Sequence, residues 1–369
     1  MKSHNLGILA HNEGEFRELE NLTSIDYSFS LLKEEVPIYG ANVYCQDITK
    51  LESASLELSW YLYNFRNEER IGLNTSYGAG IFEKNIIGEN SSDFYLCFSP
   101  DGEDLVGLDN FSATLFTSGL LSSYSVTAAV GDFPKTSVSI DALDIKHVDV
   151  GFDSYFRPGG IFTFFRPDGT SIYVTAGTID LPPFVGSIPN QLFVRPGDIR
   201  MDLGDAATAL FRLPESCVQS FSLEITPERD RISYLSERVP SNRKIRFPIP
   251  FTVTLEINPS EVNDTSLEDL LCQRTTQYMN VVFGKTPCAG GVWEILCGYS
   301  MRNIKLVSQD FSMPLNEDGN MTFKWEGQIG GFNDQHNGVF LFKADTYEGV
   351  FSTEDETLFD SEEGDYFSP

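Results

Sequence analysis

Residues 251–257 read Phe-Thr-Val-Thr-Leu-Glu-Ile, so that Phe251, Val253, Leu255 and Ile257 alternate with polar residues. Successive side chains of a β-strand point to opposite faces of a sheet. This alternation therefore predicts a strand that buries one face and exposes the other to water.

The same pattern recurs along the chain, at residues 54–62 (Ala-Ser-Leu-Glu-Leu-Ser-Trp-Tyr-Leu) and 321–325 (Met-Thr-Phe-Lys-Trp). Turn signals separate such segments, including Pro-Asp-Gly at 100–102 and 167–169 and Asp-Gly at 318–319. These residue types favour the backbone conformations of tight turns. Strands joined by turns predict a mainly β chain built as antiparallel sandwiches or partial barrels.

Helical signals are few. We expect a helix at roughly 265–280, because Ser266 is a suitable N-cap and leucines follow it at helical spacing. We expect a second, short helix at 227–236, because Pro227 suits the first turn of a helix. The predicted fold class is thus β with few short helices.

Three short segments recur in the same order along the chain. The pairs are Ser28–Leu31 with Ser220–Leu223, Val36–Pro37 with Val239–Pro240, and Ser55–Leu58 with Thr254–Ile257, and their offsets in residue number are 192, 203 and 199. Each match alone is a generic strand pattern. Their common order predicts a duplicated domain.

The duplication suggests a division of the chain. We expect an N-terminal arm at 1–22, a first β domain at 23–150, a connecting segment at 151–215, a second β domain at 216–345 and an acidic C-terminal tail at 346–369. The last of these has no basic residue, which is typical of a solvated extension.

The charge of the chain restricts its partners. Its 54 acidic residues against 26 basic ones give a net charge of -28. This charge argues against binding to nucleic acid or to anionic lipid, since both need Lys and Arg. The N-terminus lacks the apolar core of a signal peptide, and no stretch is long and apolar enough for a membrane span.

Candidate chemistry is sparse. The six cysteines form no C-x-x-C pair and favour free buried thiols, and hence synthesis in a reducing cytoplasm. The four histidines are far apart in sequence, and no nucleophile elbow, P-loop or dinucleotide fingerprint occurs. We therefore predict no enzyme activity, no cofactor and no metal site.

One segment is basic against this acidic background, and it has two interpretations. It could be a solvated face with local ion pairs, or an electropositive patch that meets the acidic surface of a neighbouring copy. Its residues are Arg229, Arg231, Arg238, Arg243, Lys244 and Arg246.

Several motifs together resemble the major tail tube proteins of tailed bacteriophages, most strongly over 190–260. They are Leu-Phe-Val-Arg-Pro-Gly-Asp-Ile at 192–199, Cys-Val-Gln-Ser-Phe-Ser-Leu at 217–223, the run from Arg229 to Leu235, Val239–Pro240, Arg243, and Phe247-Pro248-Ile249.

The resemblance implies a β-sandwich or partial barrel with a flanking helix, which assembles into stacked rings whose strands line a lumen. It implies no cofactor and no catalytic residue. The implied partners are other copies of the chain, the terminator, distal tail and tape measure proteins, a possible sheath, and genomic DNA that passes without specific binding. The implied location is the virion, after synthesis in the bacterial host cytoplasm. A duplicated chain predicts rings of three chains, with rings of six as the alternative.

Two other functions compete with this one. A different phage tail or head β-protein (distal tail, tail terminator or decoration protein) would share the fold and the acidity, but would differ in copy number. A carbohydrate-active or carbohydrate-binding sandwich would use aromatics to stack on sugars. However, Trp60 and Trp325 lie in alternating strands, where we expect them in the core.

Overall fold

A computed structural model gives the fold of most of the chain. The described residues are 5–12, 15–30, 33–36, 45–49, 53–76, 80–82, 92–99, 110–151, 161–165, 171–175, 179–180, 194, 199–205, 211–212, 218–232, 242–258, 277–285, 294–312, 319–331, 334 and 336–343.

The described part is mainly antiparallel β, as the sequence predicts. Its elements up to residue 151 are β1 (Asn5–Asn12), β2 (Glu15–Glu18), β3 (Leu22–Ser30), β4 (Lys33–Val36), β5 (Cys45–Thr49), β6 (Ser53–Tyr61), α1 (Arg66–Arg70), β7 (Ser92–Ser99), β8 (Asn110–Ala129), β9 (Lys135–Ala142) and β10 (Asp144–Gly151). Those that follow are β11 (Ile161–Phe165), β12 (Ser171–Thr175), β13 (Ile179–Asp180), β14 (Ile199–Asp205), β15 (Phe211–Arg212), β16 (Val218–Ile225), β17 (Arg229–Ile232), β18 (Asn242–Ile245), β19 (Ile249–Ile257), β20 (Gln277–Lys285), β21 (Glu294–Ser312), β22 (Asn320–Ile329) and β23 (Gly338–Lys343).

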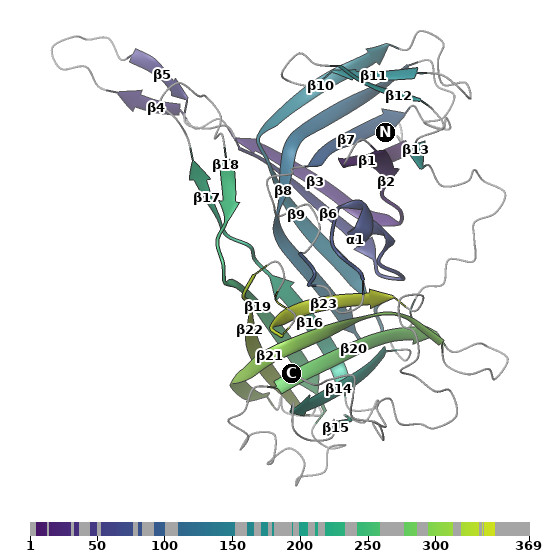
Figure 1. Ribbon diagram of the computed structural model, residues 1–369, viewed down its shortest axis with the longest axis vertical. Coiled ribbons are helices and arrows are strands. Elements are labelled where there is room, and N and C mark those ends of the chain that lie inside the picture. Colours follow the sequence, from purple (N-terminus) through teal and green to yellow (C-terminus); the bar gives the residue numbers. More distant parts are fainter. Residues whose placement is uncertain are drawn as a thin grey trace.

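Eight strands form one antiparallel sheet, here called the main sheet, in the order β3–β6–β9–β8–β16–β19–β22–β21 (Figure 1). The three alternating segments predicted as strands are confirmed, because they lie in β6, β19 and β22. In β19 every second residue from Ile249 to Ile257 is buried. The main sheet therefore has one apolar face and one polar face.

The long strands β8 and β21 each enter a second sheet. The N-terminal part of β8 lies between β7 and β10, and β1 and β2 extend that sheet. The N-terminal part of β21 lies between β20 and β23, and β14 and β15 extend that one. Both flanking sheets contribute to one hydrophobic core with the apolar face of the main sheet.

Two tryptophans lie in that core, as expected from their strands. Trp60 is 1% exposed and donates a hydrogen bond to Glu68, and Trp325 is 3% exposed and donates one to Gln277. Each buried indole N–H thus has a partner, which removes the cost of its desolvation. Cys97 and Cys297 are buried thiols outside any disulfide, as predicted.

The helix predictions need correction. Residues 229–232, inside the helix expected at 227–236, form β17, which pairs with β18. Of the helix expected at 265–280, residues 277–280 belong to β20, and the rest lies outside the described residues. In both places the backbone hydrogen bonds go to another strand, β18 in the first case and β14 and β21 in the second, and such pairing overrides local propensity.

The pairing of the second half repeats that of the first, strand for strand. Eight pairings within β1–β10 have a counterpart within β14–β23: β1–β2 with β14–β15, β1–β7 with β14–β20, β3–β6 with β16–β19, β4–β5 with β17–β18, β6–β9 with β19–β22, β7–β8 with β20–β21, β8–β9 with β21–β22, and β8–β10 with β21–β23. The halves are joined where β8 pairs with β16, here called the internal joint.

Candidate functional site: two open edges and a polar face

One end of the main sheet is β3. Among the described residues, this strand pairs with β6 on one side and with no strand on the other. The side chains of Tyr27 and Phe29 are 46% and 39% exposed, although both point to the apolar side of the sheet. An unpaired edge with exposed aromatics is a template for pairing with another chain.

The other end of the main sheet is the C-terminal part of β21. Residues 305–312 pair with β22, and within the described part of the chain they have no second strand partner. Val307 and Phe311 on this segment are 54% and 56% exposed. Here β3 and residues 305–312 of β21 are together called the open edges.

The exposed large hydrophobic side chains of the described residues are informative about these edges. Four of them lie on the open edges, and the other two, Val130 and Phe133, lie at the β8–β9 connection. Monomeric proteins usually protect an edge strand with charge, proline or a covering segment. The described residues show no such cover over Tyr27 or Phe311, so both edges suit a partner that supplies a strand.

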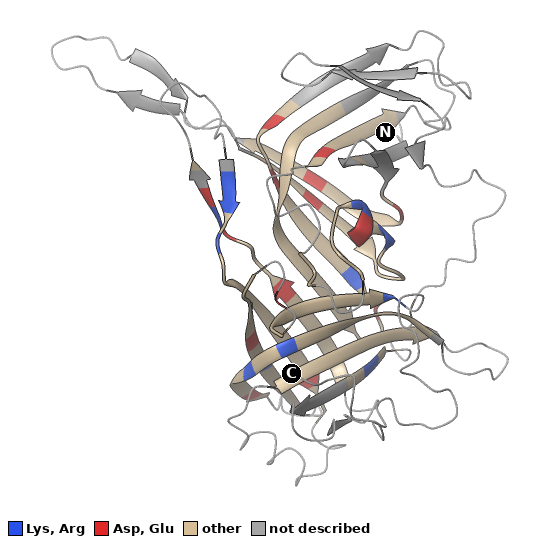
Figure 2. Cartoon of the chain, viewed as in Figure 1, with Lys and Arg blue, Asp and Glu red and all other residues tan. Residues whose placement is uncertain are grey.

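Hydroxyl and carboxylate residues alternate with the buried residues along the main sheet and form its polar face. Figure 2 colours the Asp and Glu residues of these strands red and the Lys and Arg residues blue. Serine pairs bridge its strands, with 2.8 Å between the Ser28 and Ser55 hydroxyls and 2.9 Å between those of Ser59 and Ser137. Its charged residues, those that alternate with the buried ones, are the acidic Asp26, Glu57, Asp141, Glu224, Glu256, Asp310 and Glu326 and the basic Lys135, Lys305 and Lys324. The face is therefore net acidic.

The predicted basic segment lies on β17, β18 and the residues after β18. Arg243 is 8% exposed and donates hydrogen bonds to the carbonyl oxygens of Asp141, at 2.8 Å, and of Ser118. Arg229 donates to the carbonyl oxygen of Leu121. Both arginines therefore attach the β17–β18 hairpin of the second half to β8 and β9 of the first. Burial, with Arg243 nearby, lowers the pKa of Arg229 to about 10.

Of the other members, the two whose side chains are described, Lys244 and Arg246, are exposed. Arg246 forms exposed ion pairs with Asp230, at 2.5 Å, and with Glu228, at 3.6 Å. The side chain of Arg231 and all of Arg238 lie outside the described residues. Contact with a neighbouring chain stays a prediction for this segment.

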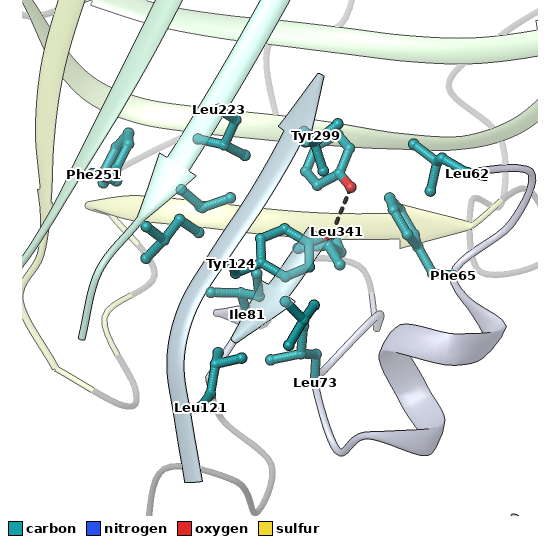
Figure 3. Packing of buried hydrophobic residues seen from close by; sticks show 14 of the residues in the cluster. Leu62, Phe65, Leu73, Ile81, Leu121, Tyr124, Leu223, Phe251, Tyr299 and Leu341 are labelled. Atoms are coloured by element: carbon teal, nitrogen blue, oxygen red, sulfur yellow. Dashed lines mark hydrogen bonds between the residues drawn. The ribbon is translucent and has the colours of Figure 1, made fainter. Parts of the chain in front are cut away.

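A buried polar cluster lies where the halves meet. The Glu68 carboxyl accepts hydrogen bonds from Trp60 at 3.1 Å, from Thr136 at 3.2 Å and from Tyr124 at 3.5 Å. The Tyr124 hydroxyl is also 2.7 Å from that of Tyr299, and a dashed line in Figure 3 marks this hydrogen bond. Burial raises the pKa of Glu68 to about 7. Each of these residues is enclosed by the core, and we assign the cluster to stability.

Two further features concern metals and membranes. Within the described ranges, no group of three or more His, Cys, Asp or Glu residues is placed to hold a metal ion. Among the helices described, none has the length and apolar character needed to cross a membrane.

The residues of the open edges were not identified from the sequence. A signal existed at 25–29, where Ile, Tyr and Phe alternate with Asp and Ser. This pattern predicts a strand, but a buried strand and an open edge share it, because the number of neighbours depends on distant segments.

Comparisons with known proteins find similar solved structures but no matching family or curated protein. A chain of the anti-feeding prophage baseplate aligns with 11% identity and a TM-score of 0.27, over 40% of this chain and 93% of its own length. An Hcp protein aligns with 13% identity and a TM-score of 0.24, over 39% of this chain and 98% of its own length. An Hcp1 protein of E. coli EAEC 042 aligns with 12% identity and a TM-score of 0.20, over 40% of this chain and 98% of its own length. TM-scores this low do not establish a shared fold.

Proposed function

We propose that this chain is a structural virion protein that assembles through its open edges into stacked rings and so forms the tube of a phage tail. The observation that carries the proposal is one main sheet with a net acidic polar face and an apolar strand edge at each end, which is unpaired among the described residues. Different edges at its two ends suit head-to-tail contacts, which close into rings or grow into filaments.

The polar face is the proposed lining of the lumen. Its carboxylates repel phosphate groups, whereas a basic lining would bind the duplex along its length. Its serines and threonines present hydroxyl groups that need no charge to be hydrated. A tube with such a lining lets DNA pass without holding it. No catalytic group is needed for this role, and the proposed partners are the terminator, distal tail, tape measure and sheath proteins.

Negative-stain electron microscopy and mass measurement of the purified chain test the proposal. We expect rings or tubes that contain three chains per ring, with six as the alternative. A chain that stays monomeric at all concentrations and salt conditions would contradict it. In a virion preparation, the chain should be among the most abundant proteins. A low copy number would instead favour a distal tail, terminator or decoration protein.

Charge reversal tests the lining. Glu57 and Glu224 are exposed on the polar face. Tubes of the Glu57→Lys/Glu224→Lys variant should bind duplex DNA, with an affinity that falls steeply as salt rises. The matched control is Glu228→Lys, because the Glu228 side chain is 71% exposed and lies outside the main sheet. Equal DNA binding by both variants would show that the polar face does not line the lumen.

A further inference from the structure

We propose that the internal joint is the template for the contact between chains, so that Tyr27 of one chain pairs directly opposite Phe311 of the next. This inference rests on the proposed function and adds a residue-level register to it. The inference requires that the two halves are repeats, and that the difference in residue number between equivalent positions, here called the offset, is known. The irregularities of the strands give these offsets.

The first offset comes from the long strands. The pairing of β8 with β9 shifts between Leu121 and Ser123, and that of β21 with β22 shifts between Leu306 and Ser308. The offset is 185, because 306 minus 121 and 308 minus 123 both give this value. A bulge bends and twists its strand at a defined position, so a bulge shared at one offset is a strong sign of structural equivalence.

Two more irregularities in this region share the offset. Ser118 in β8 and Asn303 in β21 both have left-handed backbones, with φ of 52° and 59°, and 303 minus 118 is again 185. Such a conformation is uncommon for residues other than glycine. The pairing of β7 with β8 shifts after Ser92, that of β20 with β21 shifts after Gln277, and 277 minus 92 is also 185.

The second offset comes from the strands at the joint. The pairing of β3 with β6 shifts between Leu22 and Ser24, and that of β16 with β19 shifts between Val218 and Ser220. This offset is 196, because 218 minus 22 and 220 minus 24 agree. It replaces the offset of 192 indicated by the short sequence match of Ser28–Leu31, which found the equivalent strands but misplaced them by four positions.

These correspondences support a duplicated chain whose copies begin at β1 and at β14. In this division residues 5–12 belong to the first copy, because β1 pairs with β7 as β14 pairs with β20. This division assigns the described residues 5–12 and 15–18 to the first copy, whereas the sequence predicts an arm at 1–22.

The internal joint supplies the register. In it Leu223 of β16 lies opposite Val126 of β8, and both side chains are fully buried. Subtracting 196 from 223 gives Tyr27, and adding 185 to 126 gives Phe311. The same transfer of the pair Ile225 and Tyr124 puts Phe29 opposite Gln309, and that of Glu224 and Ser125 puts Ser28 opposite Asp310.

The transferred register keeps like faces together. Tyr27 lies opposite Leu56 and Phe311 opposite Met321, on the apolar side of the main sheet, whereas Ser28 and Asp310 lie on the polar face. The two most exposed aromatics of the open edges would therefore cover each other. A shift of one residue would instead put an aromatic on the polar face.

Tyr27 and Phe311 are not paired within one chain. They lie on the first and the eighth strand of the main sheet, and among the described residues β3 pairs with β6 and residues 305–312 of β21 pair with β22. A contact between them is thus a contact between chains. Because every chain adds two copies of the repeat, each ring contains an even number of copies.

Cysteine cross-linking tests the register. Under oxidation, the assembled Tyr27→Cys/Phe311→Cys variant should give a ladder of covalent species on a non-reducing gel, ending at the number of chains in the ring, which we expect to be three. Side chains directly opposite on neighbouring strands lie within reach of a disulfide. The single variants Tyr27→Cys and Phe311→Cys control for the natural cysteines. Ser28→Cys/Phe311→Cys is the matched off-register control, because Ser28 points to the opposite face.

The outcomes separate the two proposals. Rings that form by electron microscopy but give no ladder, or give an equal one with the Ser28→Cys pair, overturn the register and leave the proposed function in place. A wild-type chain that never assembles overturns both. Because Tyr27 and Phe311 are exposed, the substitutions should leave the fold intact, and circular dichroism of each variant checks this.

Discussion

The hydroxyl oxygens of Tyr124 and Tyr299 lie 2.7 Å apart in the buried interior, and 175 residues separate the two tyrosines along the chain. Tyr124 belongs to β8 of the first half and Tyr299 to β21 of the second. The ring of Phe65 packs edge-to-face on that of Tyr299, at 5.0 Å between ring centroids. Both contacts of Tyr299, the hydrogen bond to Tyr124 and the packing on Phe65, join the second half to the first in addition to the internal joint.

Removal of either hydroxyl should destabilise the chain. Tyr124→Phe or Tyr299→Phe leaves a buried partner with one hydrogen bond fewer, at a cost of about 1–2 kcal/mol each. The double variant should cost less than the sum, because the shared bond is lost only once. Chemical denaturation of the four proteins measures this coupling. Strictly additive effects would show that the two hydroxyls do not interact.

Glu68 should make stability depend on pH. Its folded-state pKa of about 7 lies above the ordinary 4.5, so the folded chain keeps the proton to higher pH than the unfolded chain. The stability contributed by this proton is fully present below about pH 4.5 and is lost as pH rises to about 7. The loss amounts to roughly 3 kcal/mol. Glu68→Gln removes the titration. The free energy of unfolding of this variant, relative to that of the wild type, should therefore rise by that amount as pH increases across this range.

Denaturation at several pH values measures the difference between the two proteins. Glu57→Gln is a suitable control, because it removes a carboxylate that is exposed on the polar face. A constant difference between wild type and Glu68→Gln from pH 4.5 to 8 would show that folding does not raise the pKa of Glu68.

Strands with one buried face could be predicted from the sequence, but their partners could not. The alternation at 251–257 and 54–62 shows which side chains are buried, whatever strand lies alongside. The pairing of β8 with β16 joins residues more than ninety positions apart, and no local pattern records it. The open edges of β3 and β21 were missed for the same reason.

The helix α1 was also missed, for a different reason. Its five residues, Arg66–Arg70, are polar and carry no apolar periodicity. Asn67, Glu68 and Arg70 are nevertheless buried. The burial of two of them depends on specific partners, since Arg70 forms an ion pair with Glu20 at 2.8 Å and the Asn67 amide donates to the Glu20 carbonyl at 2.7 Å. Glu20 is distant in sequence, so no local pattern predicts this burial.

Arg243 should matter for stability, and its neighbour Lys244 should not. Arg243→Ala leaves the carbonyl groups of Ser118 and Asp141 without their charged donor, which should cost about 2–3 kcal/mol. Lys244→Ala changes an exposed side chain on the same strand and should stay within about 0.5 kcal/mol of the wild type. Chemical denaturation compares them. Equal losses would show that the hairpin is held by other contacts.

A charge at the open edge should block assembly without unfolding the chain. Phe311 is 56% exposed, so Phe311→Lys should change the free energy of unfolding of the monomer by no more than about 0.5 kcal/mol. In an assembled ring the lysine would be enclosed beside Tyr27 without a counter-charge, and such burial is costly. Sedimentation should therefore show monomers, whereas the conservative Phe311→Leu should still assemble.

A second substitution should restore assembly. Opposite charges directly across two strands attract each other by roughly 0.2–1 kcal/mol. Because the proposed register puts residue 27 of one chain opposite residue 311 of the next, Tyr27→Glu/Phe311→Lys places a complementary pair at every joint. Tyr27→Glu alone should fail to assemble, and the double variant should form rings that weaken as salt rises. Assembly of Phe311→Lys at wild-type concentrations would show that this edge is not part of the joint. If the double variant fails to assemble, as the two single variants do, the partner of Phe311 lies elsewhere on β3.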